Sequence, residues 1–289
     1  AVRWGPLVEG DLSDRNLLEE TLARYRIAAV LHFAAFAYVG ESVTEPQLYF
    51  RNNVANSLNL IEAMERTRVR RIVFSSTCAT YGLPDKMPIA EETPQHPVNP
   101  YGESKLMIER MLHWQGEARG LAYAALRYFN AAGADPGGEI GEAHDPETHL
   151  IPIVLDTARG ARAAVEIFGT DYPTPDGTAI RDYIHVTDLA EAHVLALRHL
   201  LAGGPSLRLN LGTGHGYSVR QVIEAAERVT GRSISRREAP RRPGDPPVLV
   251  ADARQARAIL DWIPMQSSLE QILATAWAWH GRCCGGAVA

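Results

Sequence analysis

The chain has 289 residues, 46% of them hydrophobic and 22% charged, a balance that excludes disorder and leaves enough apolar area for one large or two modest cores. It holds no apolar run of roughly 18 residues, and its first residues lack the basic and apolar blocks of a signal peptide, so we expect no membrane span and no secretory route. The net charge of −5 provides no basic surface for nucleic acid.

Short apolar runs alternate with longer amphipathic stretches in the first part of the chain, and this order of strand, helix and strand implies a parallel sheet with right-handed crossovers. The predicted fold class is therefore α/β. In two helical stretches apolar residues recur at i, i+4 and i+7, which puts each set on one helix face. These sets are Val54, Leu58 and Ile61, and Met107, Met111 and Trp114. The predicted strands lie at 7–9, 29–33, 71–76 and 123–128, and the predicted helices near 13–25, 45–67 and 101–119.

The alternation stops after Asn130, where a new domain or lobe is predicted to begin. Ser218 with Gln221, and Ser268 with Gln271, have the spacing of capping boxes and predict two helix starts. The remaining predicted elements are loops at 131–146 and 170–177, helices from about His149 and at 187–201, and strands at 183–186 and 207–211.

Two further segments resemble ligand sites but are assigned none. Gly212, Gly214 and Gly216 follow a predicted strand, yet their spacing differs from the dinucleotide-binding fingerprint, so we predict a turn. His144 and His149 suggest a metal site, but no cysteine or carboxylate set completes a coordination sphere at a credible sequence spacing. No metal is therefore expected.

The strongest chemical signal is Tyr101-Gly102-Glu103-Ser104-Lys105, at the start of a predicted helix. A phenol and an ammonium four residues apart share a helix face, and the positive charge favours the phenolate, so we expect Tyr101 to have a lowered pKa and to act as a general base. The alternative is an exposed aromatic beside a solvated cation, although Lys105 is one of only two lysines. Thr77 ends a predicted strand at the edge where parallel sheets bind ligands. Its alternative role is a turn or a helix cap.

With further motifs in order along nearly the whole chain, these residues resemble the extended short-chain dehydrogenase/reductase superfamily and, within it, the UDP-glucose 4-epimerases. The resemblance implies a Rossmann-like, doubly wound parallel sheet with a smaller α/β substrate-binding domain. It assigns 1–129 with about 183–214 to NAD binding, and about 130–182 with 215–289 to nucleotide-sugar binding. The motifs are Val8-Glu9-Gly10-Asp11-Leu12, His32-Phe33-Ala34-Ala35, Val39-Gly40-Glu41-Ser42, Asn52-Asn53-Val54, Phe74-Ser75-Ser76-Thr77, Tyr101-Gly102-Glu103-Ser104-Lys105, Arg127-Tyr128-Phe129-Asn130, Ile167-Phe168-Gly169-Thr170-Asp171-Tyr172-Pro173, Arg181-Asp182-Tyr183-Ile184-His185-Val186, Asn210-Leu211-Gly212-Thr213-Gly214 and Arg241-Arg242-Pro243-Gly244-Asp245.

The resemblance implies that the chain interconverts UDP-glucose and UDP-galactose by transient oxidation at C4 with bound NAD, in a homodimer formed through the helices near 45–67 and 101–119. Tyr101 would take the proton of the sugar 4-hydroxyl, Thr77 would bond the reacting oxygen, and Lys105 would hold the nicotinamide ribose. Dehydratase and decarboxylase relatives carry an acid after the threonine, whereas Cys78-Ala79 supplies none. The other implied NAD contacts are Asp11, Leu12, Phe33, Ala34, Ala35, Ala37, Asn52 and Phe129.

For the nucleotide sugar, arginines provide forked, charge-assisted hydrogen bonds to a diphosphate. The resemblance places Arg181 and Arg242 there, with Asp245 holding the ribose or orienting Arg242. Leu249 stands where some members carry a tyrosine that limits substrates to non-acetylated sugars, so we hypothesise that it leaves room for a 2-N-acetyl group. The other implied substrate contacts are Asn130, His149, Leu150 and Phe168.

Two departures from the family pattern stand out. The family opens with a βαβ unit that carries G-x-x-G-x-x-G for the pyrophosphate, and about 45 to 50 residues of that pattern are lacking. We expect a fragment of a longer protein, the alternative being an unusual protein that lost its first strands. Ala37 replaces a lysine that some epimerases direct at the cofactor phosphates, which weakens the expected retention of NAD. The alternatives kept open are an epimerase of UDP-xylose and UDP-arabinose or of UDP-N-acetylhexosamines, and an inactive nucleotide-sugar-binding fragment. The cysteines, Cys78, Cys283 and Cys284, form no disulfide framework, which predicts a reducing, cytoplasmic location.

Overall fold

The computed structural model describes residues 3–242 and 244–283, so Pro243 and Cys284 lie outside the described part. None of the described helices combines the length and the apolar character that crossing a bilayer requires. The described chain divides into two compact units. Unit 1 runs up to Pro84 and continues with Glu91–Tyr128 and Ala192–Asn210, and unit 2 consists of Asp85–Ala90, Phe129–Glu191 and the residues from Leu211 onward.

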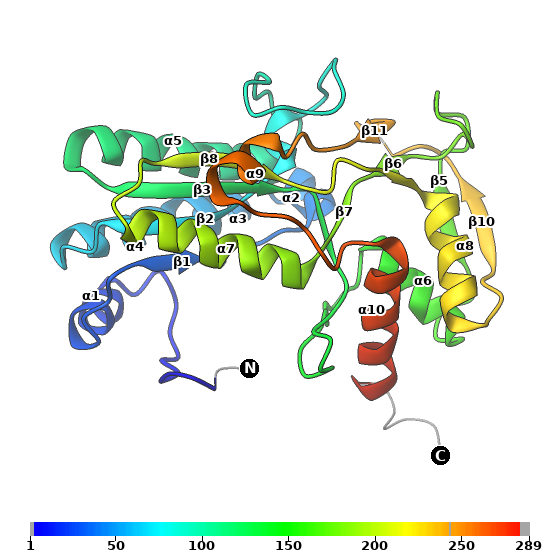
Figure 1. The fold of residues 1–289 in the computed structure, drawn as a ribbon, viewed down its shortest axis with the longest axis horizontal. Coiled ribbons are helices and arrows are strands. Elements are labelled where there is room, and N and C mark those ends of the chain that lie inside the picture. Colours follow the sequence, from blue (N-terminus) through cyan, green and yellow to red (C-terminus); the bar gives the residue numbers. More distant parts are fainter. Residues whose placement is uncertain (1–2, 243, 284–289) are drawn as a thin grey trace. The chain divides into compact units, whose positions relative to one another are not determined.

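Unit 1 is built on a four-stranded sheet in the order β1–β2–β3–β8 (Figure 1). The first three strands are parallel, with Val30 opposite Ile72 and Ile72 opposite Tyr123. Helical segments connect each parallel pair, as such crossovers require. The elements of this unit are α1 (Arg15–Arg24), β1 (Val30–His32), α2 (Val39–Thr44), α3 (Pro46–Tyr49), α4 (Asn56–Arg66), β2 (Arg71–Thr77), α5 (Pro100–Arg119), β3 (Ala122–Tyr128), the end of α7 (Val186–Leu201) and β8 (Leu207–Leu211).

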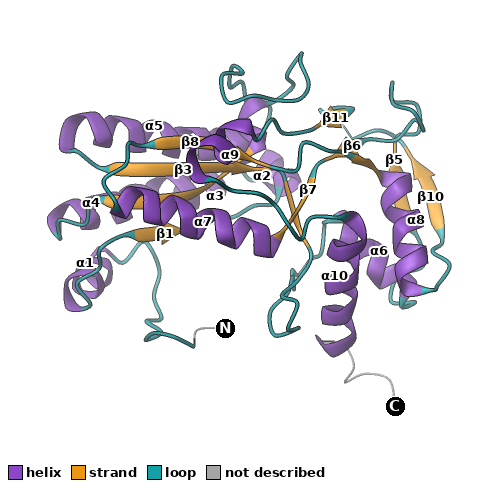
Figure 2. Cartoon of the chain, viewed as in Figure 1, coloured by secondary structure: helices purple, strands orange, loops and turns teal. Residues whose placement is uncertain are grey.

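Helices cover both faces of this sheet because side chains alternate along its strands. On one face of β3, Tyr123 and Ala125 join an apolar core with residues of α1, α4 and α5. On the other face, the ring of Tyr128 lies 6.0 Å from that of His193 on α7. Figure 2 shows these helices in purple around the orange strands. The predicted α/β class with a doubly wound parallel sheet is confirmed, and the predicted strands at 29–33, 71–76 and 123–128 appear as β1, β2 and β3.

The prediction of a strand at 7–9 is wrong, because these residues form no strand and belong to no sheet of the described chain. A strand is stabilised by hydrogen bonds to a neighbour, and β1, at the edge of the sheet, pairs only with β2 among the described strands. Leu7 accordingly has 67% of its surface exposed. The strand propensity of residues 7–9 therefore does not produce a strand, because no neighbouring strand pairs with them in the described chain.

The single helix predicted at 45–67 is also corrected. The structure divides this stretch into α3, a π-helical segment at Phe50–Ala55 and α4. A π turn holds an extra residue and shifts the phase of every later side chain. Of the set predicted to share one face, Ile61 is buried in the core but Leu58 is 40% exposed. The predicted helices at 13–25 and 101–119 are confirmed as α1 and α5.

Unit 2 contains three small sheets around an apolar core formed mainly by α6, α8 and α10. The predicted capping box of Ser218 and Gln221 is present in both directions at the start of α8, and the Ser268 hydroxyl accepts a hydrogen bond from the Gln271 N–H at the start of α10. The elements are β4 (Asn130–Ala132), α6 (Leu150–Ala158), β5 (Val165–Phe168), β6 (Ile180–Arg181), β7 (Tyr183–His185), the start of α7, β9 (Tyr217–Ser218), α8 (Val219–Thr230), β10 (Arg236–Ala239), β11 (Val248–Leu249), α9 (Arg254–Leu260) and α10 (Leu269–Cys283).

The glycine segment after β8 is a turn, as predicted, and the structure shows what occupies its backbone. The carboxylate of the buried Asp182 accepts hydrogen bonds from the N–H groups of Thr213 at 2.9 Å, Gly214 at 3.0 Å and Ala251 at 3.1 Å. Gly214 has a φ of 77°, which favours glycine. An internal carboxylate therefore takes the donors that a phosphate would need.

Candidate active site

The C-terminal end of β2 carries a threonine that also starts the next turn. The Thr77 hydroxyl accepts a hydrogen bond from the Ala79 N–H at 3.1 Å and so caps the 3₁₀ helix Cys78–Tyr81. The capping alternative considered from the sequence is therefore real. The cap leaves the Thr77 hydroxyl free to form a second hydrogen bond, which joins it to the phenol of Tyr101.

The start of α5 brings Tyr101 to this strand end. The Asn99 side chain accepts a hydrogen bond from the Gly102 N–H at 2.8 Å, which caps the helix, and Pro100 occupies its first turn. A Cβ at Gly102 would lie 2.5 Å from the carbonyl oxygen of Ala79, so only glycine allows the helix to approach the 3₁₀ helix this closely.

The ammonium of Lys105 lies buried beside the same strand. Its Nζ donates to the carbonyl oxygen of Ser75 at 2.9 Å and lies 5.0 Å from the centre of the Phe74 ring and 5.9 Å from that of Tyr101. Tyr101 and Lys105, four residues apart, thus share one helix face that is turned to the end of β2, as predicted. The structure brings Thr77, Tyr101 and Lys105 together.

The expected lowering of the Tyr101 pKa is wrong for the chain by itself. Burial raises the pKa of Tyr101, as does the neighbouring Tyr128, and the hydrogen bond with Thr77 only partly opposes them. Burial also lowers the pKa of Lys105 to about 7, which weakens the positive charge that was expected to favour the phenolate. In this environment desolvation outweighs the attraction between the two groups.

Tyr128 and Ser75 belong to the sequence motifs given above, but neither was predicted to be a site residue. The structure shows that their hydroxyls form a hydrogen bond to each other beside Tyr101. Burial raises the pKa of Tyr128. The alternation of side chains on neighbouring strands is the signal that could have found this pair, because Ser75 lies opposite Leu126 and faces the same side as Tyr128.

The loop after β1 contains four of the implied NAD contacts, Phe33, Ala34, Ala35 and Ala37. It is held by a residue that was not selected from the sequence. The Asn53 side chain accepts a hydrogen bond from the Phe36 N–H at 2.9 Å and donates to the Phe36 carbonyl at 3.1 Å and to the Ser104 hydroxyl at 3.1 Å. The amide of Asn52 donates to the Asn53 side chain at 3.0 Å. Asn53 therefore connects this loop to the helix of Tyr101 and Lys105.

The remaining implied NAD contacts are Asp11, Leu12 and Phe129. The Asp11 carboxylate accepts a hydrogen bond from the Ser13 N–H at 2.8 Å, and bonds with Ser13 lower the pKa of Asp11. The carbonyl of Leu12 accepts from Asn59 on α4 at 3.1 Å. Phe129 is buried in unit 2.

In unit 2 the implied nucleotide-sugar contacts form two groups. Arg181 forms an ion pair with Asp245 and lies opposite Leu249 in the pairing of β6 with β11. The guanidinium of Arg242 lies 4.0 Å from the centre of the Phe168 ring. The suggestion that Asp245 orients Arg242 is therefore corrected, because the carboxylate pairs with Arg181. Asn130 is joined to this region through β4, where its N–H donates to the Asp182 carbonyl at 3.0 Å.

His149 and Leu150 stand at the start of α6, where His149 caps the helix without a side-chain bond. The Nδ1 atom of His149 contacts the carboxylate of Glu142, and so does that of His144. The premise that no carboxylate completes the set around these histidines is thus wrong, since the loop brings in residues that sequence spacing did not single out.

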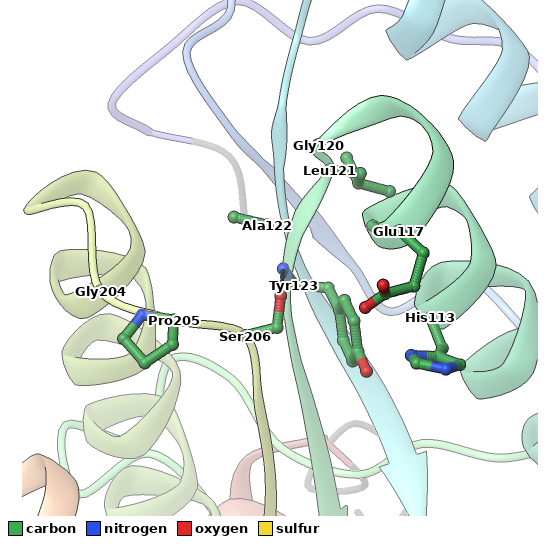
Figure 3. Close-up of a pocket in the computed structure, with 10 residues that line it drawn as sticks. His113, Glu117, Gly120, Leu121, Ala122, Tyr123, Gly204, Pro205 and Ser206 are labelled. Atoms are coloured by element: carbon green, nitrogen blue, oxygen red, sulfur yellow. Dashed lines mark hydrogen bonds between the residues drawn. The ribbon is translucent and has the colours of Figure 1, made fainter.

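Figure 3 shows a pocket at the other end of the sheet. Its volume is about 380 Å³, and His113, Glu117, Tyr123 and Ser206 are among the residues that line it. It lies at the start of β3 and the C-terminal part of α5, whereas Tyr101 and Thr77 lie at the start of α5 and the end of β2. The pocket is therefore separate from the candidate active site.

The sequence pattern of the NAD dependent epimerase/dehydratase family matches residues 2–212, most of the chain. The chain belongs to this family. A curated relative, the UDP-glucose 4-epimerase of Streptococcus mutans serotype c, is 52% identical to this epimerase-family chain over 273 residues, which cover 94% of the chain and 82% of the relative.

Solved structures agree with this assignment to the epimerase/dehydratase family. UDP-glucose 4-epimerase from Brucella ovis in complex with NAD has 53% sequence identity and a TM-score of 0.93, over 95% of this chain and 85% of that one. UDP-glucose 4-epimerase from Bifidobacterium longum in complex with NAD+ and UDP has 40% identity and a TM-score of 0.91, over 96% and 84%. The fold and the family resemblance stated from the sequence are confirmed.

Proposed function

We propose that the chain interconverts UDP-glucose and UDP-galactose by transient oxidation at C4 with bound NAD. The observation that carries the proposal is the convergence of Thr77, Tyr101 and Lys105 at the C-terminal end of β2, where α/β sheets bind ligands. The similarity of about half of all positions to UDP-glucose 4-epimerases supports the same reaction. The NAD complex of the Brucella ovis protein supports the cofactor.

The residues of unit 1 fit NAD. An ammonium has three donors, and the hydrogen bond of Lys105 to the Ser75 carbonyl uses one of them, so donors are left for a ribose hydroxyl. The loop after β1 has small side chains at Ala34, Ala35 and Ala37, which allows a dinucleotide to approach its backbone closely. We assign the ribose to Lys105 and the rest of the cofactor to this loop, Asn52 and the Asp11–Leu12 segment.

In the mechanism that follows, bound NAD would supply a reversible acceptor for the hydride of C4. The Tyr101 oxygen accepts the proton of the sugar 4-hydroxyl and later returns it. The Thr77 hydroxyl bonds the same sugar oxygen and holds it against Tyr101. The Lys105 ammonium, 5.9 Å from the centre of the Tyr101 ring, lowers the free-energy cost of forming the phenolate while it is charged. Since the hydride and the proton both return, no net oxidation occurs.

Unit 2 offers the charges for the nucleotide. A diphosphate carries about two negative charges, and guanidinium groups bind it with two parallel hydrogen bonds. Asp245 fixes Arg181 at one such position, and the face of Phe168 supports the plane of Arg242 at the other. We propose that these arginines bind the UDP diphosphate, with Asn130, His149 and Leu150 as further contacts. Unit 1 would be the NAD-binding unit and unit 2 the nucleotide-sugar-binding unit.

The test is made on the purified chain without added cofactor. We expect some NAD to be released on denaturation, in less than equal amount to protein because Ala37 weakens its retention, and UDP-galactose to be converted to UDP-glucose, as measured by liquid chromatography. Binding of UDP by calorimetry with neither NAD nor conversion, even after NAD is added, would instead establish an inactive nucleotide-sugar-binding fragment. Conversion of UDP-xylose and UDP-arabinose alone would move the proposal to the pentose nucleotides.

Leu249 leads to a second expected activity on N-acetylated sugars. It is partly buried on β11, opposite Arg181, and is smaller than a tyrosine. We expect the wild-type chain to convert UDP-N-acetylglucosamine, and Leu249→Tyr to lose at least about tenfold on that substrate while keeping conversion of UDP-galactose, because one clash costs 1–3 kcal/mol. Leu249→Met is the matched control. A wild-type chain active on UDP-galactose but inactive on the acetylated sugar refutes the hypothesis.

We further propose a cytoplasmic homodimer. Two helices that pack against each other, α4 and α5, carry exposed apolar side chains, namely Leu58, Met107 and Trp114. Exposed apolar groups gathered on neighbouring helices are typical of an interface between subunits. The low cysteine content suits a reducing compartment.

A further inference from the structure

Four side chains with metal-binding atoms converge in the loop that leads from β4 to α6. They are Glu142, His144, Glu147 and His149, and their ligand atoms all lie within 4.8 Å of one another. The Nδ1 atom of His144 lies 2.9 Å from Glu142 Oε1 and 3.9 Å from Glu147 Oε1. The Nδ1 atom of His149 contacts Glu142 Oε1 and lies 3.9 Å from Glu147 Oε1.

These separations match a coordination sphere. Imidazole nitrogens and carboxylate oxygens bind zinc at about 2.0–2.2 Å, which places neighbouring tetrahedral ligands about 3.4 Å apart. The distances from His144 to the two carboxylates, 2.9 and 3.9 Å, lie on either side of this value. Small rotations of side chains therefore suffice to surround an ion.

The charges in the cluster also favour a cation. The side chains of Glu142 and Glu147 are only 17% and 11% exposed, while those of His144 and His149 are 43% and 48% exposed. Across the described residues, the ion pairs of these two carboxylates are with the two imidazoles, and no lysine or arginine side chain takes part. Two shielded carboxylates close together repel each other, and a divalent cation between them relieves the repulsion.

The backbone around the cluster is held independently of any ion. Glu147 Oε1 accepts hydrogen bonds from the N–H groups of Thr148 and His149, both at 2.8 Å. The indole of Trp279 on α10 donates to the carbonyl oxygen of Glu142 at 2.8 Å. A Cβ at Gly141 would lie 2.3 Å from the Trp279 ring, so glycine is needed for the loop to lie against that helix. The four ligands are thus presented by a braced loop.

We propose that Glu142, His144, Glu147 and His149 bind one divalent transition-metal ion of the zinc class. Two imidazole nitrogens with two carboxylate oxygens are a set of ligands that suits zinc. Magnesium and calcium prefer oxygen ligands only, so this set disfavours them. The ion ties the loop to the first residue before α6. The site shares His149 with the contacts proposed for the nucleotide sugar, but it includes none of Thr77, Tyr101 and Lys105. Its test measures metal binding and does not depend on the proposed reaction.

The test is titration of the untagged, chelator-treated chain with ZnCl₂ by calorimetry, with CoCl₂ absorption as a geometric probe. We expect one equivalent of zinc with micromolar or tighter affinity, and cobalt bands of a tetrahedral site. His144→Ala and Glu142→Gln should each weaken zinc binding at least tenfold. The matched controls are Asp145→Asn, a carboxylate of the same loop outside the set, and His215→Ala, a histidine elsewhere in unit 2; both should bind zinc as the wild type does.

Circular dichroism separates loss of ligand from loss of fold. His144 is about half exposed, so its replacement should leave the far-ultraviolet spectrum unchanged. Zinc should also raise the midpoint of thermal unfolding of the wild type and of both controls, but not that of folded His144→Ala. Absence of saturable zinc binding by the wild type, equal binding by His144→Ala, or equal affinity for magnesium would overturn the proposal.

Discussion

Replacement of Tyr101 by phenylalanine should reduce the conversion of UDP-galactose by about 10²–10⁴-fold, the usual contribution of a positioned general acid or base. Phenylalanine keeps the ring but removes the only atom that can take the 4-hydroxyl proton in the proposed mechanism. Removal of the phenol oxygen leaves Lys105 and the Thr77 cap in place, because their hydrogen bonds to the Ser75 carbonyl and from the Ala79 N–H do not involve it. The loss should therefore fall on kcat, measured with saturating UDP-galactose.

Two controls distinguish chemistry from damage to the site. Tyr25→Phe removes a phenol at the end of α1, far along the chain from α5, and should retain wild-type activity. The Tyr101→Phe variant should also retain as much NAD as the wild type, since the ribose is assigned to Lys105. Activity within tenfold of the wild type, with NAD bound, would show that Tyr101 is not the base.

Glu109→Gln should lower the free energy of unfolding by about 3–5 kcal/mol, because it leaves a buried arginine without its charge partner. Arg127 on β3 and Glu109 on α5 are each 2% exposed, and their closest atoms are 2.6 Å apart. Two further hydrogen bonds join the Arg127 Nε to the same carboxylate at 2.9 and 3.2 Å. Burial by itself lowers the pKa of Arg127, whereas the hydrogen bonds and charge of Glu109 raise it. A guanidinium stays charged in proteins even without a carboxylate partner, so the substitution leaves a buried charge unpaired.

The matched control for this prediction is Glu65→Gln, which breaks an exposed ion pair. Arg119 and Glu65 are 3.2 Å apart, but their side chains are 66% and 45% exposed. Water screens such a pair, so the change should cost less than about 1 kcal/mol. The measurement is urea unfolding of the full chain by circular dichroism. If Glu109→Gln costs no more than Glu65→Gln, the buried pair does not stabilise unit 1 in the way described.

The same pair also supports the candidate active site. The hydroxyl of Ser76, which immediately precedes Thr77, donates to the Glu109 carboxylate. On the other side of the pair, the guanidinium of Arg127 donates to the Tyr81 phenol at 2.9 Å, and that phenol donates to Asn210 at 2.7 Å. These buried hydrogen bonds hold the end of β2 that carries Thr77 in place. A single unpaired charge among them would disturb that strand end.

Signals with a short sequence range identified the framework correctly. The strands β1, β2 and β3 were predicted from apolar runs, α5 from its periodicity, and the start of α8 from the pair Ser218 and Gln221. Each depends on neighbours within a few residues, as the capping box does. The proximity of Tyr101 and Lys105 has the same origin, because four residues span one helical turn.

Two features could not be predicted from the sequence pattern. One depends on a change in the helical phase of the side chains, and the other on the lack of a neighbouring strand. The π-helical segment Phe50–Ala55 rotates α4 relative to the predicted single helix, and it also positions Asn53 under the loop after β1. The stretch 7–9 has strand propensity but no hydrogen-bonding partner in the described chain. Periodicity carries no information on either point.

By itself, the sequence determined the α/β class, the order of β1, β2 and β3 with the helices α1 and α5, the Tyr101–Lys105 spacing and the family, since these follow from local chemistry or from ordered motifs. Only the tertiary structure decided the ionisation of Tyr101, the pairing of Asp245 with Arg181, the buried Glu109–Arg127 pair and the gathering of Glu142 and Glu147 around two histidines. The physical reason is that a charge responds to burial and to every group within a few ångströms, and folding sets both through contacts between residues distant in sequence.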